Sequence, residues 1–573
     1  MILDARQMPD DERLTADVCI VGGGPAGITL AHELIGSGLS VILAEAGGEK
    51  PDGDLWPVFG GEVLTARHPP SDLYRSRCLG GTSALWGGRC APFDNLDFEA
   101  RDWVPYSGWP IARADLDDAY GRAARYCDLG RADWRVNGVM RERAPEMIPG
   151  FTDPVLDTAA IDRFSPPVRF GERYRDAIAA SGNLRVLLNA NCLSLGLAPS
   201  ADHVAVLRMA SVPGRRFTVT ADACVLAAGG LETPRLLLES DDVVPTGIGN
   251  AKGLVGRFYL CHLQGKAGVV KLHTSLDGVV HEYERDEEGV YCRRKLRIVE
   301  AEQRRLRLMN VAVRFEHPAI PDPGHRSGIL SAMYLSRHFL AREYSRKLAE
   351  CGLNGENGRP PLATLALHVR NILIDAPSVA GFAARWFPNR RWGTRRIPYV
   401  SPPNRDNRFH LDYYAEQAPN PDSRVMLAPE RDAFGRRRLR IDWRTSAQDH
   451  DNVVATYRLM KERLLASGLG DLVFDEAQLR SDFGAIGGHH IGTARMADDP
   501  SLGVVDPDCR VFGVDNLYIA SAAVFPTTGH VSPTLTAVAF AVRLADHLRS
   551  RMGRGRWDGQ ASGTFGRWRP QSL

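Results

Sequence analysis

Apolar and polar residues near the start of the chain follow a strand, turn, helix and strand order. Residues 17–22, DVCIVG, form a short apolar run behind a polar lead-in, as a buried parallel strand does. The next stretch, ITLAHELIGSG, has helical spacing of its apolar residues, and a second apolar run, SVILAEAG, contains Glu45 near its end. These patterns predict a βαβ unit of about 30 residues.

Further strand patterns follow in the middle of the chain. Residues 184–197, LRVLLNANCLSLGL, predict a pair of strands, and VAVLRM and RFTVTA continue the pattern. Residues 223–238, ACVLAAGGLETPRLLL, predict a strand, a small-residue turn and a helix that starts near Thr233 and Pro234. Together these segments predict a sheet assembled from separated parts of the chain.

The turn of the first unit reads GGGPAG, residues 22–27. Gly22 would permit the tight turn, Gly24 would let the backbone approach a pyrophosphate, and Gly27 would allow the helix to pack on the strand. The helix N-terminus would offer N–H groups to phosphates. Glu45 can accept hydrogen bonds from a ribose diol and disfavours a 2′-phosphate, so FAD or NAD is expected rather than NADP.

Two later segments favour FAD over NAD. FAD is long, so the sheet that binds it is assembled from separated segments of the chain. Residues 223–238, some two hundred residues after the first unit, would supply such a segment. A third segment, residues 77–88, reads RCLGGTSALWGG. Such dense glycine with one tryptophan suits backbone wrapped around a flat ligand, and an ordinary surface loop is the alternative.

Composition narrows the class of protein. The 573 residues suggest about four units, or two large interleaved ones. The 71 basic and 69 acidic residues nearly cancel, which argues against a nucleic-acid binder. No apolar run approaches the ~20 residues of a membrane span, and the N-terminus lacks a signal-peptide pattern, so a cytoplasmic location is expected. The ten cysteines contain no C-x-x-C pair, so we expect free, mostly buried thiols and no metal site.

Six ordered segments resemble the glucose–methanol–choline (GMC) oxidoreductases: VGGGPAG with AEAGG, RCLGGTSALWGG, VLAAGGLETPRLLL, GGHHIGTARM, VVDPDCRVFGVDNLYIA and FPTTGHVSPTLTAVAFAVRLADHL. The resemblance covers roughly residues 15–265 and 405–550. It implies an α/β fold (α+β overall), with a Rossmann-type FAD-binding domain and a substrate domain built on a large antiparallel sheet packed by helices.

We expect the FAD-binding domain to comprise residues 1–110, 180–265 and 480–550, and the substrate domain to comprise 111–179 and 266–479. Residues 330–400 would be an insertion, and 551–573 a flexible tail. Leu85 stands where covalent relatives carry the linking histidine, so dissociable FAD is expected. The expected cofactor-binding residues are Gly22, Gly24, Pro25, Ala26, Gly27, Glu45, Ala46, Arg77, Gly80, Gly81, Thr82, Ser83, Trp86, Gly87, Gly88, Cys192, Ala227, Ala228, Gly229, Ala520, Ser521, Ser532, Pro533 and Thr534.

Two adjacent histidines lie in GGHHIGTARM, residues 487–496. Flavin-dependent alcohol oxidation needs a base for the hydroxyl proton, and a histidine is the natural choice. If the stretch is extended, neighbouring side chains point to opposite sides, so only one faces the flavin. The H-x-x-G-T pattern of the resemblance implies that His489 is the base and that His490 supports it.

The second active-site residue of the family is Asn or His just before PTLT, and here that position is Ser532. Serine can donate and accept a hydrogen bond but is not a base. Ser532 would leave room for a bulkier carbinol carbon, with a water in place of the amide. Alternatively, His530 would act as the partner, since it lies on the same side of an alternating strand.

Substrate contacts are expected from residues 410–425, which resemble the strand over the active site of sugar-oxidising relatives. Tyr414, Glu416 and Gln417 would stack on or bond to a polyol, and a solvated strand is the alternative. His262 is a further candidate. The basic, aromatic segment 382–400 would touch an anionic membrane surface or an acidic partner, cover the pocket as a lid, or form a solvated insertion.

The leading hypothesis is an FAD-dependent enzyme that oxidises a CH–OH group to a carbonyl, favouring a sugar or glycoside. Its partners would be a small-molecule alcohol and an electron acceptor, either O₂ or a separate molecule. The alternatives are oxidation of a bulkier alcohol, such as a sterol, terpenoid or biosynthetic intermediate, and a flavin-fold lyase without net redox chemistry. An NAD-dependent dehydrogenase is disfavoured by the separated FAD-type segments.

Overall fold

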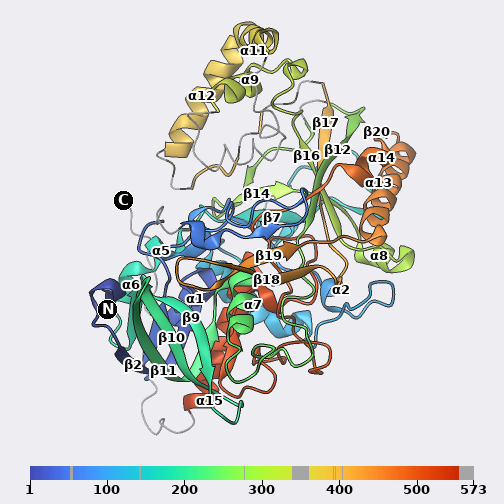
Figure 1. Cartoon of the computed structure of the whole chain (residues 1–573). Helices are drawn as coiled ribbons and strands as arrows, with labels where there is room; N and C mark the ends of the chain where they lie inside the picture. The colour runs from blue at the N-terminus through green and yellow to red at the C-terminus, as the bar shows by residue number, and fades with distance from the viewer. Residues whose placement is uncertain are drawn as a thin grey trace.

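The computed structural model (Figure 1) describes residues 1–553 except 52–55, 141–143, 276–277, 338–360, 392, 394, 400, 403 and 405. The expected tail lies outside the described residues from 554 onward, and so does residue Cys351. The other nine cysteines are buried, with no disulfide among them.

An eight-stranded sheet forms the nucleotide-binding half of the described chain. Strand β11 has three partners in this sheet: it pairs in parallel with β2 and β22 and antiparallel with β10. The strand order is β1 (Ile2–Asp4), β8 (Leu184–Leu188), β3 (Val41–Ala44), β2 (Glu12–Val21), β11 (Arg215–Leu226), β10 (Val204–Val212) and β9 (Asn191–Leu197), with β22 (Leu517–Ile519) beside β11. All of these strands come from the three segments expected to form the FAD-binding domain.

One sequence expectation about this sheet needs correction. Residues 184–197 do form two strands, β8 and β9, but these do not pair with each other. Both edges of β8 are occupied by the parallel strands β1 and β3. Strand β9 therefore pairs with β10 instead.

Helices cover this sheet and complete its core. The apolar face predicted after the glycine turn belongs to α1 (Pro25–Glu33), whose Ile28 and Leu30 are buried in the same core as Leu535 of α15 (Thr534–Gly553). Helix α3 (Asp117–Tyr126) packs on α15, and α7 (Gly229–Glu239) follows β11. No helix in the described part of the chain is long and apolar enough to cross a membrane.

The second large sheet is antiparallel, with β17 at its centre between β12 and β16. Helix α13 (Ala447–Ser467) packs its Tyr457 and Met460 into the core under this sheet. The order is β20 (Gly470–Val473), β12 (Leu263–Leu272), β17 (Arg408–Ala415), β16 (Val311–Glu316), β15 (Leu296–Ile298) and β6 (Leu156–Asp157), with β21 (Gly484–Ala485) on β12. The expected α/β fold with an antiparallel substrate sheet is thus present, although the expected boundary at residue 265 falls inside β12.

Two small sheets join the halves. One contains β13 (Glu284–Arg285), β14 (Tyr291–Arg294), β7 (Ile161–Phe164) and β5 (Arg89–Cys90); the other contains β18 (Arg424–Arg431), β19 (Arg437–Asp442) and β4 (Glu62–Val63). The remaining short helices are η1 (Ala5–Gln7), η2 (Trp56–Phe59), η3 (Gly81–Ala84), α2 (Asn95–Phe98), η4 (Arg113–Leu116), α4 (Val136–Val139), α5 (Phe170–Arg173), α6 (Arg175–Ala180), α8 (Glu300–Leu306), η6 (Pro323–His325), α14 (Glu476–Ser481) and η8 (Ala522–Val524).

The expected insertion at 330–400 forms a separate helical outcrop, at the top of Figure 1. Its described helices are α9 (Gly328–Leu335), α11 (Leu362–Ile374) and α12 (Ala376–Arg391). They share a small apolar cluster that includes Leu330 and Tyr399. Most of the basic, aromatic segment 382–400 is thus the second half of α12 and the chain after it.

Candidate active site

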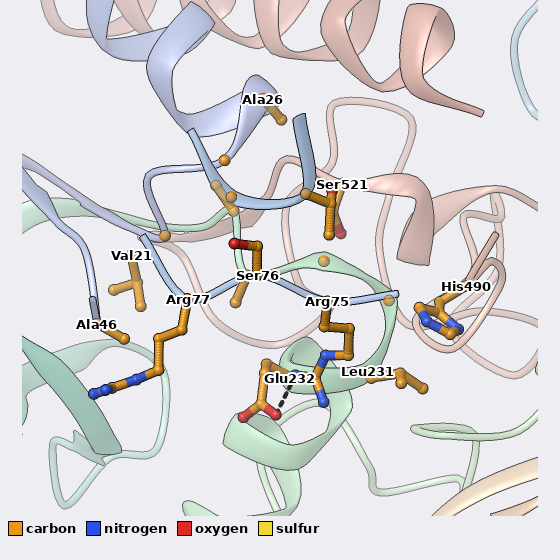
Figure 2. Close-up of a pocket in the computed structure, with 18 of the residues that line it drawn as sticks. Val21, Ala26, Ala46, Arg75, Ser76, Arg77, Leu231, Glu232, His490 and Ser521 are labelled. Carbon is orange, nitrogen blue, oxygen red and sulfur yellow. Dashed lines mark hydrogen bonds and ion pairs between the residues drawn. The ribbon is translucent and has the colours of Figure 1, made fainter. Parts of the chain in front are cut away.

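A long cleft with about 1360 Å³ of empty space, part of which is open solvent, runs along the carboxyl ends of β2 and β3 and past the start of α1. Figure 2 shows Ala46 and Arg77 near one end and His490 at the other. The cleft brings together most of the expected cofactor residues: Gly22, Gly24, Pro25, Ala26, Glu45, Ala46, Arg77, Gly81, Thr82, Cys192, Ala227, Ala228, Gly229, Ser521, Pro533 and Thr534.

The other expected cofactor residues lie elsewhere. Trp86, Gly87, Gly88 and Ser532 line a second cavity that adjoins the cleft. Gly27, Gly80, Ser83 and Ala520 lie behind the walls of these two cavities, as far as the described residues define them. Ser83, for example, is buried and donates its hydroxyl to the Gly80 carbonyl at 2.6 Å.

The glycine turn fits a bound pyrophosphate. Gly22 has a φ of 109°, and a Cβ there would lie 2.6 Å from the Ala227 carbonyl oxygen. A Cβ on Gly27 would overlap the Gly22 carbonyl oxygen, whereas one on Gly24 would meet no described atom within 4 Å. Gly24 caps α1 without a side-chain hydrogen bond, so the first N–H groups of that helix face the cleft.

Glu45 holds the other side of this turn. Its two carboxylate oxygens accept hydrogen bonds from the backbone N–H groups of Gly23 and Gly47, both at 2.8 Å. Burial raises the pKa of Glu45 to about 7. Each oxygen keeps a lone pair that a ribose hydroxyl could use. The Glu45 end of the cleft therefore suits the adenosine half of FAD.

Three charged residues that the sequence patterns did not indicate also line the cleft: Arg75, Glu232 and Arg436. Arg75 donates from Nη2 to Glu232 Oε1 at 2.5 Å, the bond drawn in Figure 2. Within the described chain, Arg75 Nη1 and Arg436 Nε are buried without a hydrogen-bond partner. Such guanidinium donors match an anionic ligand, so the cleft fits the diphosphate of FAD. The one available signal was the place of Arg75 beside the glycine-rich segment.

Substitutions at two glycines separate packing from cofactor contact. Gly24→Ala is expected to leave the fold intact and to weaken FAD binding about tenfold or more, because its Cβ projects into open cleft space. Gly27→Ala is expected to lower stability as well, because its Cβ would overlap backbone. Thermal unfolding of the apoprotein and FAD titration measure the two effects. Equal apoprotein stability in both variants would contradict this assignment.

The second cavity has an empty volume of about 1110 Å³, again including some open solvent, and adjoins the cofactor cleft. The two share Thr82, Gly488 and Thr534. Among the expected residues, the cavity contains His489, Ser532 and Tyr414. The sequence patterns did not indicate six further residues of its wall: Tyr74, Arg89, Phe164, Gln264, Tyr283 and Ile486. Pro398, from the segment 382–400 for which a lid over the pocket was one interpretation, also lines the cavity. The expected base and substrate-stacking residues thus meet in one cavity, whose wall includes several aromatic side chains.

The hydrogen bonds of His489 determine which of its nitrogens can act as a base. His262 is fully buried, and burial lowers its pKa to about 4, so its ring is neutral. Its Nε2 lies 3.1 Å from the Thr528 carbonyl oxygen, which can only accept, so Nε2 carries the proton. His262 Nδ1 must then accept from His489 Nδ1, 3.0 Å away. This leaves His489 Nε2 unprotonated.

The structure places the other expected residues apart from this cavity. His530 is buried, and neither of its ring nitrogens has a hydrogen-bond partner among the described residues. Its Nδ1 lies 3.7 Å from Asp94. Glu416 forms a fully buried ion pair with Arg101. Gln417 is also fully buried and donates to the Arg444 carbonyl at 2.8 Å. These three side chains are held by the protein interior rather than at the wall of the cavity.

Arg89 brings a positive charge to the cavity wall. Its guanidinium lies 4.5 Å from the centre of the Tyr414 ring, which a second arginine, Arg314, contacts at 4.7 Å. Arg89 Nε is 3.9 Å from Asp162, whose carboxylate also pairs with Lys295 and Arg314. One carboxylate is therefore shared by three cations, and Arg89 is the one that lines the cavity.

A cleft suited to a dinucleotide that adjoins a cavity lined by a neutral histidine is the arrangement expected of a flavin-dependent oxidoreductase. Comparison with known families agrees. A sequence model described as FAD dependent oxidoreductase matches residues 17–334, more than half of the chain. The GMC oxidoreductase model matches residues 419–541. The chain belongs to the GMC oxidoreductases, which confirms the resemblance and makes it an oxidoreductase that acts on alcohol groups.

Similar proteins cover nearly the whole chain at low identity. Paromamine 6'-oxidase of Streptomyces fradiae is 22% identical over 594 residues, covering 94% of this chain and 91% of the relative. The 5-(hydroxymethyl)furfural oxidase of a Methylovorus species is 26% identical over 603 residues, covering 93% and 98%. The solved structure of a fungal aryl-alcohol oxidase covers 95% of this chain and all of its own, with a TM-score of 0.51 at 16% identity. This structural likeness supports the fold alone.

Proposed function

We propose that the enzyme oxidises a CH–OH group of a sugar or glycoside to a carbonyl, with His489 as the base. The observation that carries the proposal is the unprotonated Nε2 of His489, on a histidine that lines the cavity adjoining the cofactor cleft. Bound FAD would supply the hydride acceptor. His489 Nε2 would accept the hydroxyl proton, while the bond from His489 Nδ1 to His262 keeps the ring in place.

Ser532 is the proposed partner for the substrate oxygen, because it lines the cavity with His489. His530 is a less suitable partner, since it is buried beside Asp94. The positive charge of Arg89 on the same wall would favour oxygen that gains negative charge as its proton leaves.

The sugar assignment is supported by the lining of the cavity. Aromatic rings such as Trp86, Tyr283 and Tyr414 offer flat apolar faces, and Gln264 offers an amide. Three relatives, the paromamine oxidase, a fructose dehydrogenase large subunit of Gluconobacter japonicus and a C-glycoside 3-oxidase of Microbacterium trichothecenolyticum, are named for sugar-like substrates. A bulkier alcohol is the second candidate, because Ser532 is shorter than the family's Asn or His.

Anaerobic bleaching of the visible flavin band tests the function directly. The holoenzyme is mixed with a panel of sugars, glycosides, terpenoid alcohols and sterols. Bleaching by a sugar or glycoside supports the proposal, and bleaching by the bulkier alcohols alone supports the second candidate. No bleaching across the panel would contradict alcohol oxidation and favour lyase chemistry. Reoxidation with O₂ or with an added electron acceptor then identifies the oxidant.

Dissociable FAD is a second part of the proposal. Leu85 occupies the position of the linking histidine and lines the substrate cavity with an unreactive side chain. Acid precipitation of the holoenzyme is therefore expected to release all of the flavin into the supernatant. Flavin that stays with the protein pellet would contradict this.

The pH dependence of flavin reduction should reflect His489. Burial, followed by the nearby His262 and Arg89, lowers the pKa of His489 well below 6.5. The unprotonated base is therefore present above that depressed pKa and lost only as the pH falls through it. We expect kcat/KM for the best alcohol to be flat between about pH 6 and pH 8 and to fall at lower pH. A fall that begins at the ordinary histidine pKa of about 6.5 would contradict the assignment.

A further inference from the structure

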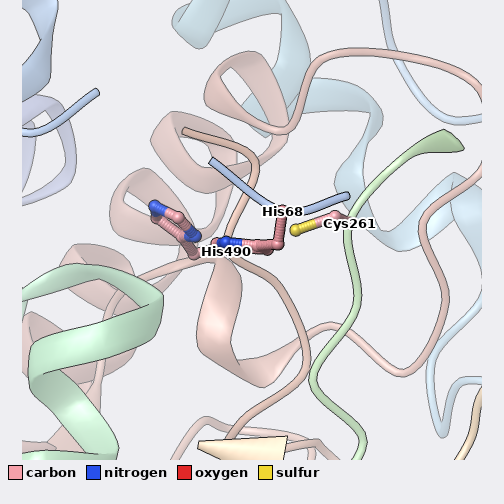
Figure 3. A group of neighbouring side chains, drawn as sticks. All are labelled: His68, Cys261 and His490. Atoms are coloured by element: carbon pink, nitrogen blue, oxygen red, sulfur yellow. The ribbon is translucent and has the colours of Figure 1, made fainter. Parts of the chain in front are cut away.

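His490 differs from His489 in the cavity that it lines. His489 lines the substrate cavity, whereas His490 lies in the cofactor cleft, at the end opposite Ala46 in Figure 2. Behind His490 lie two other potential ligand groups, His68 and Cys261, shown in Figure 3. Their three ligand atoms lie within 4.8 Å of one another. This cluster lies outside the catalytic step proposed above.

The hydroxyl of Tyr259 connects all three members of the cluster. It lies 2.7 Å from His68 Nε2 and 2.7 Å from His490 Nδ1, and Cys261 Sγ donates to it at 3.3 Å. His68 Nδ1 lies 2.7 Å from the Pro69 carbonyl oxygen. Tyr259 and Cys261 are fully buried, and His68 nearly so. A continuous set of hydrogen bonds therefore runs from Pro69 to His490.

The direction of each bond follows from the Pro69 carbonyl, which can only accept. His68 Nδ1 must donate to it, and burial lowers the pKa of His68 to about 4, so the ring is neutral and Nε2 accepts. The Tyr259 hydroxyl then donates its one proton to His68 Nε2. Its oxygen accepts from Cys261 and from His490, so His490 Nδ1 carries a proton.

His490 is also neutral, because burial lowers its pKa well below 6.5. A neutral imidazole has one N–H, and that proton is on Nδ1. Its other nitrogen, Nε2, is therefore left as an acceptor on a ring that lines the cofactor cleft.

We propose that His490 is a cofactor-binding residue whose Nε2 accepts a hydrogen bond from a ring N–H of the bound flavin, and that Tyr259 and His68 are positioning residues that fix its tautomer. Because the Glu45 end suits adenosine, the isoalloxazine would occupy the His490 end, beside the residues shared with the substrate cavity. The oxidised isoalloxazine carries a single ring N–H. The inference rests on FAD as the cofactor and is independent of the alcohol.

Two other roles for the cluster fit the contacts less well. A proton path to solvent would need a titratable group at its outer end, and the bonds end instead at the Pro69 carbonyl. A metal ion would need the position among the three ligand atoms that the Tyr259 hydroxyl already contacts. With Tyr259 present, every donor and acceptor joined by these hydrogen bonds is satisfied without an ion, apart from His490 Nε2, which is left as an acceptor on the wall of the cleft.

Titration of the apoprotein with FAD tests the proposal. Tyr259→Phe removes the hydroxyl that orders the relay, and His490→Leu removes the acceptor. Both are expected to raise the Kd for FAD about tenfold. His490→Gln keeps a side-chain acceptor and is expected to stay within about threefold of the parent protein. Cys261→Ala is the matched control, because it contacts the same hydroxyl without setting the order of protons, and it should leave the Kd unchanged.

A second measurement needs neither FAD nor activity. In ¹⁵N-histidine-labelled apoprotein, the His490 signals, assigned by their loss in His490→Gln, should show a protonated Nδ1 and an unprotonated Nε2. Tyr259→Phe should convert them to a mixture of tautomers. A protonated Nε2 in the parent protein would overturn the proposal, even if the leucine variant fails to fold. So would an unchanged Kd in a folded Tyr259→Phe variant, or zinc or copper at one equivalent per chain by elemental analysis.

Discussion

Replacing His489 with glutamine is expected to slow reduction of the bound flavin by its alcohol about 10²- to 10⁴-fold, the usual contribution of a general base. Glutamine keeps a polar side chain of similar length but cannot take up the proton. Anaerobic stopped-flow measurement of flavin bleaching isolates this step from reoxidation. The Kd for FAD should change little, because His489 lines the substrate cavity rather than the cofactor cleft.

His203→Gln is the control for this substitution. His203 is half exposed and pairs with Asp202 at the surface, so its replacement should leave the bleaching rate unchanged. A His489→Gln variant that bleaches at the rate of the parent protein, with full FAD content, would remove His489 as the base.

Replacing Glu416 with glutamine is expected to destabilise the protein by about 3–5 kcal/mol, since it leaves Arg101 buried without its counter-charge. Both side chains are almost completely buried, and the Glu416 carboxylate also accepts from the Asn310 N–H at 3.0 Å. Denaturant unfolding of the parent and variant proteins measures the loss. The substrate KM of the remaining folded enzyme should stay the same, because Glu416 lies away from the cavity wall.

Glu476→Gln provides the matched comparison. Glu476 pairs with Arg458 on the surface, with side chains 40% and 63% exposed, so its loss should cost far less stability than the loss of Glu416. If Glu416→Gln instead raises KM with little loss of stability, Glu416 contacts substrate, as its place in the chain after Tyr414 first suggested.

The nucleotide-binding half was largely predictable because its information is local. A βαβ unit places strand, glycine turn, helix and acidic residue within one short window of sequence. Gly27 shows this well, since a Cβ on it would overlap the Gly22 carbonyl oxygen; Gly22, in contrast, is confined by Ala227, which only the fold brings near. The later strands were predicted as elements, but their pairing was not. Which strands pair depends on the whole sheet, and both edges of β8 are taken by β1 and β3, so β9 cannot pair with it.

The cavity walls were less predictable because their residues come from elements far apart in sequence. Arg89 comes from a two-residue strand, Arg436 from the turn between β18 and β19, and Pro398 from the chain after the helical outcrop. Arg89 and Arg436 lie in no pattern that sets them apart from ordinary surface residues, and for the segment 382–400, which contains Pro398, a lid over the pocket was one of several interpretations. Conversely, Glu416 directly follows β17, the strand that carries Tyr414 of the cavity wall, yet the Glu416 side chain is buried in the interior.

The histidine pair shows both what the local sequence could predict and what it could not. Spacing to Gly492 and Thr493 distinguished His489 from His490, but it could not reveal what fixes either ring. The partners of the two rings are His262 for one and Tyr259 with His68 for the other, and these come from distant parts of the chain. Only the fold brings them behind the pair.

Residues 259–263 have a consequence for engineering this enzyme. Within five consecutive positions, Tyr259 orders the ring at the cofactor, His262 orders the ring at the substrate, and Leu263 begins β12 of the antiparallel sheet. Substitutions that reshape this segment to admit a new alcohol would also disturb flavin retention. Directed evolution of specificity should therefore begin at Phe164 or Tyr283, which line the substrate cavity but not the cofactor cleft, so that the two properties can vary independently.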